Sequence, residues 1–529
     1  MATSLQAPPI RPEAHFDERM LQCYADRHHS LYAMFEEAVR SHPAREALVC
    51  GVARLTWRDL QGRVERISAG LAQAGICQGD RVAILLNNQI EFVEATLAIS
   101  RLGAIVVPIS TRDQTPGIAH ILNDCGAALL IHDVTVTLRL PAMHEVPELR
   151  ACIPASMEDA AGTFAALRRT SGDVPVARVD EDDTAAILYT SGTTGKPKGA
   201  MLAHLNIVHS AMHYGLTLDL TEHDRLIAAV PLSHVTGLVA LMATAIRCAG
   251  TLVILPAFRA AEFLALAARE RMTYTLMVPA MYNLCLIQDD CSRYDLASWR
   301  IGAFGGAIMP QATIEAVAKF LPGLTLVNVY GATETTSPAT IMPPGAGATY
   351  LDSVGRVVPC GEIVMMDDAG RQVPPRAAGE LWIRGPMVVR GYWNNPAATA
   401  ESFDSGFWKS GDIGSIDDNG FVSVFDRKKD MINRGGFKIY SSEVENVLCQ
   451  HPGVFEAAVV GKPCPVLGER VHAFVVLKDV SVTDLALKAF CAERLTDYQV
   501  PESFSLGATP LPRNANGKML KRELRLEKA

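Results

Sequence analysis

The stretch "LYTSGTTGKPKGAML", from Leu188 to Leu202, largely decides how this sequence is interpreted. It follows an apolar segment, which predicts a strand that ends near Tyr189. The residues that come next are small, hydroxyl-bearing or cationic, and they bring backbone N–H groups, hydroxyls and two lysines close together. Converging backbone amides bind anions. The stretch therefore predicts a loop that holds phosphate groups.

This loop differs from the common nucleotide-binding P-loop. Lys196 is followed by Pro197, so the spacing of a Walker A sequence is not met. The γ-phosphate chemistry of P-loop proteins is therefore not expected. The predicted phosphate-binding residues are Thr190, Ser191, Gly192, Thr193, Thr194, Gly195, Lys196 and Lys198.

Length and composition exclude several classes of protein. A chain of 529 residues predicts more than one domain. With a net charge of −8 and no block of basic residues, nucleic acid is not expected as a partner. The twelve cysteines form no C-x-x-C pair, which indicates neither a zinc nor a dithiol site and favours reduced thiols in the cytoplasm.

Neither a secretion signal nor a membrane span is expected. The first 20 residues are polar and lack the apolar core of a secretory signal. The most apolar region, Val235 to Phe258, is interrupted by Arg247 and Gly250. A membrane helix needs about 20 apolar residues without a central charge. The region therefore predicts a buried helix followed by a strand.

Helix and strand patterns alternate through the first 400 residues. The apolar residues of one predicted helix share a single face: Leu60, Val64, Ile67 and Leu71. Gly75 ends this helix, and a strand begins near Val82. Repetition of such units predicts an α/β fold with largely parallel sheets that are covered on both faces.

The pattern changes after about Ala377, where alternating segments punctuated by Gly and Pro predict antiparallel strands. The charged run from Asp426 to Asp430 predicts a junction between domains. We therefore predict a large N-terminal domain over residues 1–428 and a small, mobile α+β domain over 429–529. Within the small domain, Ser442 and Glu445 predict a capping box at the start of a helix.

Two further stretches carry a family resemblance: "NVYGATETT", from Asn328, and "KSGDIG" followed by "FDRKKDMINRGGFK". Together with the phosphate loop they resemble the adenylate-forming superfamily, in particular its acyl- and aryl-CoA synthetases. The resemblance extends from about Leu55 to Lys518. It implies an ATP-dependent acid–CoA ligase that uses Mg²⁺. Such an enzyme forms an acyl-AMP with release of pyrophosphate, and then an acyl-CoA thioester with release of AMP.

The resemblance also implies roles for residues of the "NVYGATE" segment. Tyr330 would stack on adenine, and Asn328 would reach the amino edge of the base. Thr333 would contact the α-phosphate, and Glu334 would hold Mg²⁺, a cation that prefers oxygen ligands. Four residues would lie beside the adenine and the acyl pocket: Gly305, Gly306, Ala307 and Gly331.

Later motifs would complete the site. Asp412 would accept hydrogen bonds from both ribose hydroxyls, assisted by Arg427, and Lys429 would be the hinge between the domains. The wall of the tunnel for the pantetheine arm of CoA would contain Gly435, Gly436 and Lys438. The residues that the resemblance assigns to catalysis are Lys518, Thr194, Glu334 and His234, of which His234 would gate the acyl pocket.

The acid itself is not identified by the sequence. The segment after His234 has the uncharged sequence "VTGL", which favours an uncharged acyl or aryl acid over an amino acid. A medium-chain fatty acid and an aromatic acid both stay open. The expected partners are small molecules, namely the acid, ATP and CoA. A homodimer is also left open.

Three other functions share parts of this sequence pattern. A stand-alone adenylating enzyme would load a separate carrier protein, since the eleven residues after Lys518 leave no room for a fused one. A nucleotide-binding protein with a decayed site is disfavoured, because Thr193, Glu334, Asp412 and Lys518 are all present. A luciferase-type oxygenation is a less common variant of the same chemistry.

Overall fold

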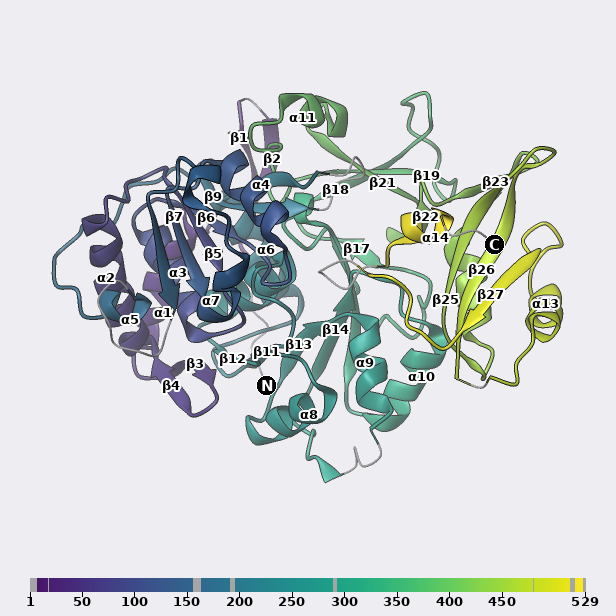
Figure 1. The fold of residues 1–529 in the computed structure, drawn as a ribbon, viewed down its shortest axis with the longest axis horizontal. Coiled ribbons are helices and arrows are strands. Elements are labelled where there is room, and N and C mark those ends of the chain that lie inside the picture. Colours follow the sequence, from purple (N-terminus) through teal and green to yellow (C-terminus); the bar gives the residue numbers. More distant parts are fainter. Residues whose placement is uncertain are drawn as a thin grey trace.

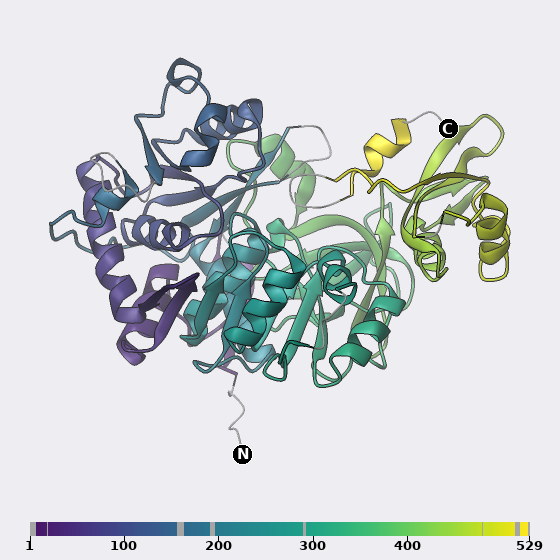
Figure 2. The same cartoon turned by 60° about the horizontal axis from the view of Figure 1, so that its bottom comes forward.

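The structure is a computed structural model that describes residues 7–17, 19–155, 163–190, 196–288, 293–478, 480–513 and 519–526. A larger N-terminal unit and a smaller C-terminal unit follow each other along the chain (Figure 1). Figure 2 shows the smaller unit at one end of the molecule, with the terminal helix α14 (Lys521–Leu526) between its sheet and the larger unit.

The first sheet of the larger unit has the strand order β10-β9-β6-β5-β7-β8. Its neighbouring strands are parallel except for the edge pair β10 and β9. The strands are β5 Arg81–Leu85, β6 Ile105–Pro108, β7 Leu129–Asp133, β8 Ala151–Ala155, β9 Thr184–Thr190 and β10 Lys198–Ala203. Nearly all residues of β5, β6 and β7 are buried, as is typical of parallel strands covered on both faces.

The second sheet has the order β18-β19-β21-β22-β17-β16-β15-β14-β13-β11-β12-β3-β4, and β20 pairs with β21. It is parallel from β3 to β15. These strands are β3 Glu46–Cys50, β11 Arg225–Ala228, β12 Thr251–Ile254, β13 Tyr274–Met277, β14 Ile301–Gly305 and β15 Thr325–Tyr330, with β4 Ala53–Thr56 antiparallel at the edge. The predicted parallel, doubly covered α/β core is confirmed.

From β16 onward the second sheet is antiparallel. Its strands there are β16 Thr340–Ile341, β17 Gly355–Val357, β18 Glu362–Met366, β19 Gly379–Arg384, β20 Phe403–Asp404, β21 Phe407–Ile416 and β22 Phe421–Arg427. The predicted change to antiparallel strands is therefore correct, although it starts before Ala377.

Two helices of the larger unit are almost entirely buried. Helix α3 (Ile90–Arg101) contacts β5 and β6 of the first sheet and β3 of the second. Helix α6 (His204–Thr217) is buried from His204 to Gly215. Neither helix has an exposed polar face, because it is covered on all sides.

The other helices of the larger unit are α1 Leu31–Ser41, α2 Trp57–Gln73, α4 Thr115–Cys125, α5 Phe164–Leu167, α7 Thr244–Cys248, α8 Ala260–Arg269, α9 Pro279–Leu286, α10 Gln311–Phe320 and α11 Pro396–Ser402. Short helical turns are η1 Val134–Arg139, η2 Met143–Glu145, the π-helix η3 Thr236–Ala243 and η5 Thr333–Thr335. The predicted apolar face of α2 is buried.

The most apolar region folds as predicted, into buried helix and strand. It forms η3, α7 and then β12. Within the described residues, none of the helices has the length and apolarity needed to cross a bilayer.

Buried histidines on α6 make stability depend on pH. Burial lowers the pKa of His204 to about 4 and that of His209 to about 3. Both stay neutral when the folded protein is acidified, whereas in the unfolded chain they take up protons below pH 6.5. Since the unfolded state binds more protons in this window, stability falls as the pH falls.

We expect a loss of about 1.4 kcal/mol for each of these histidines between pH 7.5 and 5.5. Carboxylates whose pKa is lowered, such as Glu13, lose their contribution only below their ordinary pKa of 4.5 and stay outside this window. Denaturant titrations at both pH values would measure the loss. A His209→Gln variant should lose about 1.4 kcal/mol less than the wild type, and an equal loss in both proteins would contradict the assignment.

The C-terminal unit has its own sheet of order β24-β23-β26-β25, with β27 beside β26. Its elements are β23 Ile432–Arg434, β24 Phe437–Ile439, α12 Ser441–Cys449, β25 Val454–Cys464, β26 Gly468–Leu477, α13 Asp484–Ala492, β27 Ser503–Gly507 and α14. Strand β22 of the larger sheet ends at Arg427, and β23 begins at Ile432. The charged run therefore joins two separate sheets.

The predicted capping box at Ser442 and Glu445 is wrong. Helix α12 begins at Ser441, and Tyr440 at the N-cap makes no side-chain cap. The Ser442 hydroxyl donates to the carbonyl of Phe425, and the Glu445 carboxylate accepts from the N–H of Val459 at 2.7 Å. Both side chains therefore bond to residues outside helix α12 and do not cap it.

Candidate active site at the carboxyl ends of the parallel strands

The predicted nucleotide segments lie side by side at the carboxyl ends of β14 and β15. These strands are parallel, with Gly305 opposite Val329. A Cβ atom on Gly305 would lie 2.3 Å from the carbonyl oxygen of Val329, so only glycine fits there. Gly306 follows with φ of +77°, which favours glycine as well. Open α/β sheets bind ligands at this edge.

A hydrogen-bonded group lies where the resemblance places the nucleoside. The Tyr330 hydroxyl donates to Asp412 Oδ2 at 2.6 Å, and Arg427 Nε lies 3.6 Å from Asp412 Oδ1. Asp412 and Arg427 are direct partners across β21 and β22. Burial, followed by the negative charge of Asp412, raises the pKa of Tyr330, so its hydroxyl stays a donor. Nearby, Asn328 Nδ2 donates to the carbonyl of Ser353 at 3.1 Å.

A second group lies four residues further along the chain, at Glu334. The Tyr392 hydroxyl donates to Glu334 Oε1 at 2.8 Å. Lys198 Nζ lies 5.2 Å from the centre of the Tyr392 ring, within the range of a cation–π contact. A carboxylate and a predicted phosphate-binding lysine that contact the same tyrosine suit Mg²⁺-bound phosphates, since Mg²⁺ is usually bound through a carboxylate and substrate phosphates.

Strands β9 and β10 flank the predicted phosphate loop. Thr190 and Lys198 are direct partners across them. The loop residues Ser191, Gly192, Thr193, Thr194 and Gly195 lie outside the described residues, and Lys196 is exposed. At the base of the loop, the Tyr189 hydroxyl donates to Asp124 Oδ2 at 2.6 Å.

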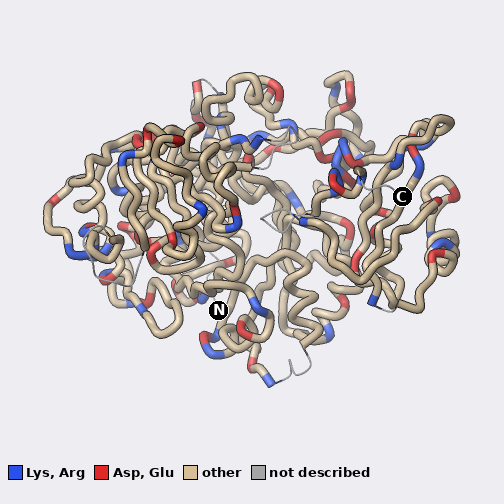
Figure 3. The backbone as a smooth tube through the Cα atoms, viewed as in Figure 1, with Lys and Arg blue, Asp and Glu red and all other residues tan. Residues whose placement is uncertain are grey.

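The junction between the units is held by charged and polar contacts. Asp426 Oδ2 accepts from the Ser441 hydroxyl at 2.6 Å. The Arg525 guanidinium donates to Asp430 Oδ1 at 2.9 Å and to the carbonyl of Lys429 at 3.0 Å. Figure 3 shows basic and acidic residues gathered in this region. The predicted hinge residue is thus contacted by the terminal helix.

The predicted CoA-contacting residues form an exposed turn of the C-terminal unit. Gly435 and Gly436 connect β23 to β24 with φ of +61° and +92°, and Lys438 is exposed on β24. Lys518 lies outside the described residues. On either side of the undescribed residues 514–518, Arg513 and Met519 form a bridge, and the Leu520 N–H donates to the carbonyl of Pro512 at 2.9 Å.

His234 lies directly before the π-helix η3 and is partly buried. Its Nδ1 is 3.2 Å from the Thr236 hydroxyl. A Cβ atom on Gly237 would lie 2.2 Å from the carbonyl of Pro231, so the chain is tightly folded back here. Short π-helical turns are frequent at functional sites. At the neighbouring edge, Ala307 is exposed, and Gly331 and Thr333 are partly buried.

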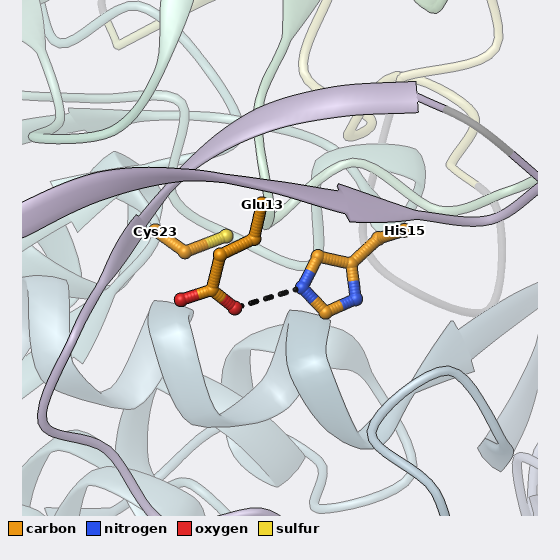
Figure 4. Close-up of side chains that lie close together, drawn as sticks. All are labelled: Glu13, His15 and Cys23. Carbon is orange, nitrogen blue, oxygen red and sulfur yellow. Dashed lines mark hydrogen bonds and ion pairs between the residues drawn. The ribbon is translucent and has the colours of Figure 1, made fainter.

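One further cluster has side chains that can bind metals, but its contacts argue for a structural role. Atoms of Glu13, His15 and Cys23 lie within 4.8 Å of one another (Figure 4). Arg27 Nη2 lies 2.6 Å from Glu13 Oε2, and Arg11 Nε lies 2.7 Å from Glu13 Oε1. Two guanidinium groups on one carboxylate oppose the binding of a cation.

The same cluster fastens the N-terminal hairpin, β1 (Ile10–His15) and β2 (Arg19–Tyr24), to the segment before β9. His15 Nδ1 lies 2.7 Å from Asp182 Oδ1, and Arg27 also pairs with Glu181 at 2.6 Å. Burial raises the pKa of the Cys23 thiol to about 12, so it stays protonated. Each cysteine within the described ranges is free, as expected.

Comparison with known families gives the same assignment as the motifs. Residues 35–393 match the family model for the AMP-binding enzyme, and residues 443–518 match the model for its C-terminal domain. The chain belongs to the AMP-binding enzyme family. The first match contains the whole first sheet and the second sheet as far along the chain as β19, and it ends next to Tyr392.

Two curated relatives of this family are CoA ligases. The long-chain-fatty-acid–CoA ligase FadD13 of Mycobacterium tuberculosis is 33% identical over 477 residues, covering 89% of this chain and 93% of the relative. Feruloyl-CoA synthase of an Amycolatopsis species is 36% identical over 488 residues, covering 92% of this chain and 96% of the relative.

A solved relative gives the same fold with ligands. The o-succinylbenzoate CoA synthetase of Bacillus subtilis, in complex with its acyl-adenylate, is 31% identical with a TM-score of 0.84, covering 95% of this chain and 99% of that one. The same enzyme was solved with ATP and magnesium, with a TM-score of 0.83, 31% identity and coverage of 93% and 98%.

The structure brings together two of the predicted groups and adds a residue. Tyr330, Asp412 and Arg427 meet as one group, and Glu334 and Lys198 both contact Tyr392. Tyr392, which links the second group, was missed by the sequence reasoning. In the sequence, Tyr392 lies in "RGYWNNP", after a segment that predicts a strand. No motif or pattern of functional residues marks it there.

Proposed function

We propose that the protein is an AMP-forming carboxylic acid–CoA ligase. The observation that carries the proposal is the spacing of the two groups at the carboxyl edge of the second sheet. Tyr330 of the first group and Glu334 of the second are only four residues apart in the chain. One group suits the nucleoside end of ATP, and the other suits its phosphates and the accompanying Mg²⁺.

In the first step, a carboxylate oxygen of the acid attacks the α-phosphorus of ATP. The bond to the β-phosphate oxygen breaks, and pyrophosphate leaves. Asp412 and Arg427 hold the ribose, Tyr330 and Asn328 hold the adenine, and Thr333 contacts the α-phosphate. Negative charge that gathers on the phosphate oxygens is stabilised by loop amides and cations fixed in place beforehand.

In the second step, the thiol of CoA attacks the acyl-AMP carbonyl, and AMP leaves with the bonding electrons. We place the boundary of the mobile domain at residues 428 and 429, with Lys429 as the hinge. Rotation about this hinge removes Lys518 from the phosphates and brings the Gly435–Gly436 turn to the pantetheine arm. The support is that β22 ends at Arg427 and that this turn is exposed.

The acid is proposed to be uncharged apart from its reacting carboxylate. The segments expected to line its pocket carry no charged side chain: Val235, Gly305–Gly306 and Gly331–Ala332. A medium-chain fatty acid and an aromatic acid both suit such a lining, and the curated relatives include both chemical classes of ligase. Free CoA is favoured over a carrier protein because these relatives are CoA ligases. A cytoplasmic location is proposed from the free thiols.

A panel of acids tests the proposal. The purified protein is expected to release AMP from ATP only when a matching acid and CoA are both present. Acid-dependent exchange of pyrophosphate into ATP should occur without CoA, since the first step does not need it. Release of ADP and orthophosphate instead, or AMP release that requires a carrier protein and not CoA, would contradict the proposal.

A further inference from the structure

Tyr392 connects the two charged parts of the phosphate end of the site. Its hydroxyl donates to Glu334 Oε1 at 2.8 Å, and its ring faces Lys198 Nζ at 5.2 Å. The side chain is only 6% exposed, so it is held by packing and not only by these contacts.

The backbone around Tyr392 is fixed to the same two parts. The Met201 N–H donates to the carbonyl of Gly391 at 3.1 Å, and the Trp393 N–H donates to the carbonyl of Gly199 at 2.7 Å. Residues 391–393 therefore continue the first sheet beyond β10, and Ala200 and Tyr392 form a bridge. On the other side, the Val389 N–H donates to the backbone carbonyl of Glu334 at 2.9 Å.

The segment from Val389 to Trp393, here called the bridge segment, thus joins the two sheets of the larger unit. It touches β10, which follows the predicted phosphate loop, and η5, which carries Glu334. A further hydrogen bond, from the Tyr392 N–H to the Thr399 hydroxyl at 2.9 Å, anchors its centre. Glu334 and Lys198 are 136 residues apart in the sequence, and this segment gives both side chains a common contact, while β10 and η5 also lie against each other.

We infer that Tyr392 is a positioning residue that sets the Glu334 carboxylate and the Lys198 ammonium at the spacing needed by metal-bound ATP. The inference rests on the proposed function and deepens it. A carboxylate that binds a metal is commonly oriented by a hydrogen bond from a neighbouring side chain, and loss of that partner costs about 10- to 100-fold in metal affinity or activity. The cation–π contact fixes Lys198 by the same ring.

A Tyr392→Phe variant isolates the hydroxyl, because the ring that faces Lys198 is kept. We expect the affinity for manganese-bound ATP, measured by equilibrium dialysis, to fall about 10-fold or more. Affinity for metal-free ATP in EDTA should stay within about twofold, since Tyr392 acts on ATP through Glu334. Acid-dependent pyrophosphate exchange should fall about 10- to 100-fold, and thioester formation from supplied acyl-AMP should be kept.

Tyr274→Phe is the matched control, because it removes another buried tyrosine hydroxyl at the amino end of β13, away from the site. It should leave every readout unchanged. Equal losses for metal-bound and metal-free ATP in Tyr392→Phe, or no loss in either, would overturn the inference. Dialysis measures ATP binding without catalysis. If the wild-type protein binds metal-bound ATP but shows no acid-dependent pyrophosphate exchange, the proposed function is refuted, whatever the Tyr392→Phe variant shows.

A double-mutant cycle gives a second, independent measure. If Tyr392 acts through Glu334, the effects of Tyr392→Phe and Glu334→Gln on the affinity for metal-bound ATP should not multiply in the double variant. Each variant should keep the melting temperature of the wild type within a few degrees. Effects that multiply fully would show that the two residues act independently and would overturn the assigned role.

Discussion

Replacing Lys518 by alanine is expected to abolish acyl-AMP formation while leaving thioester formation from supplied acyl-AMP largely intact. The lysine is proposed to stabilise negative charge on the phosphates in the first step only, and removal of one such preorganised group costs about 10²- to 10³-fold in rate. Rapid-quench measurement of each half-reaction, with pure acyl-AMP for the second, would separate the two steps.

The contacts of helix α14 support the proposal that this lysine moves with the small unit. The helix begins at Lys521, three residues after Lys518, and Lys521 Nζ lies 2.6 Å from Glu445 Oε1 of α12, with most of both side chains covered. Lys488→Ala is the matched control, because Lys488 is an exposed lysine on α13 of the same unit. Equal loss of both half-reactions in Lys518→Ala would show that the residue does not act in the first step alone.

Asp412→Ala is expected to weaken ATP binding about 100-fold. Its carboxylate is proposed to accept hydrogen bonds from both ribose hydroxyls. Hydrogen bonds to charged groups contribute about 1.5–3 kcal/mol each, so losing two costs about 3 kcal/mol or more. The variant also leaves the Tyr330 hydroxyl without its 2.6 Å acceptor. Equilibrium binding of ATP, measured calorimetrically, gives the change directly.

Asp412→Asn refines this test, because the amide keeps the shape of the carboxylate and one acceptor oxygen while removing the charge that faces Arg427. Its affinity for ATP should lie between those of the wild type and Asp412→Ala. Asp418→Ala serves as the control, since Asp418 is exposed on the turn after β21 and pairs only with the surface residue Arg376 among the contacts of the described chain. Unchanged ATP affinity in Asp412→Ala would remove it from the nucleotide site.

Local patterns were sufficient wherever a property depends on neighbouring residues in the chain. The helical face from Leu60 to Leu71, the buried helix and strand between Val235 and Phe258, and the parallel core all follow from apolar periodicity. The phosphate loop was predicted from residue chemistry, but five of its residues and Lys518 lie outside the described residues, so their roles stay predictions.

The prediction was wrong where a side chain can hydrogen-bond either within its own helix or to a residue distant in the chain. The spacing of Ser442 and Glu445 fits a capping box, yet Ser442 bonds to Phe425 and Glu445 to Val459 and Lys521. A capping box contributes about 1 kcal/mol, about as much as a single hydrogen bond elsewhere, so it does not by itself decide where these side chains bond. Sequence spacing cannot show such distant competitors.

The sequence by itself determined the class of fold, the family and the residue types that meet a nucleotide, because these depend on periodicity and on motifs that are contiguous in the chain. Only the tertiary structure decided which of those residues act together. Tyr392 contacts both Glu334 and Lys198 because residues 391–393 add to the edge of β10 while Val389 bonds to η5. That arrangement joins segments that are far apart in the chain, and no local pattern encodes it.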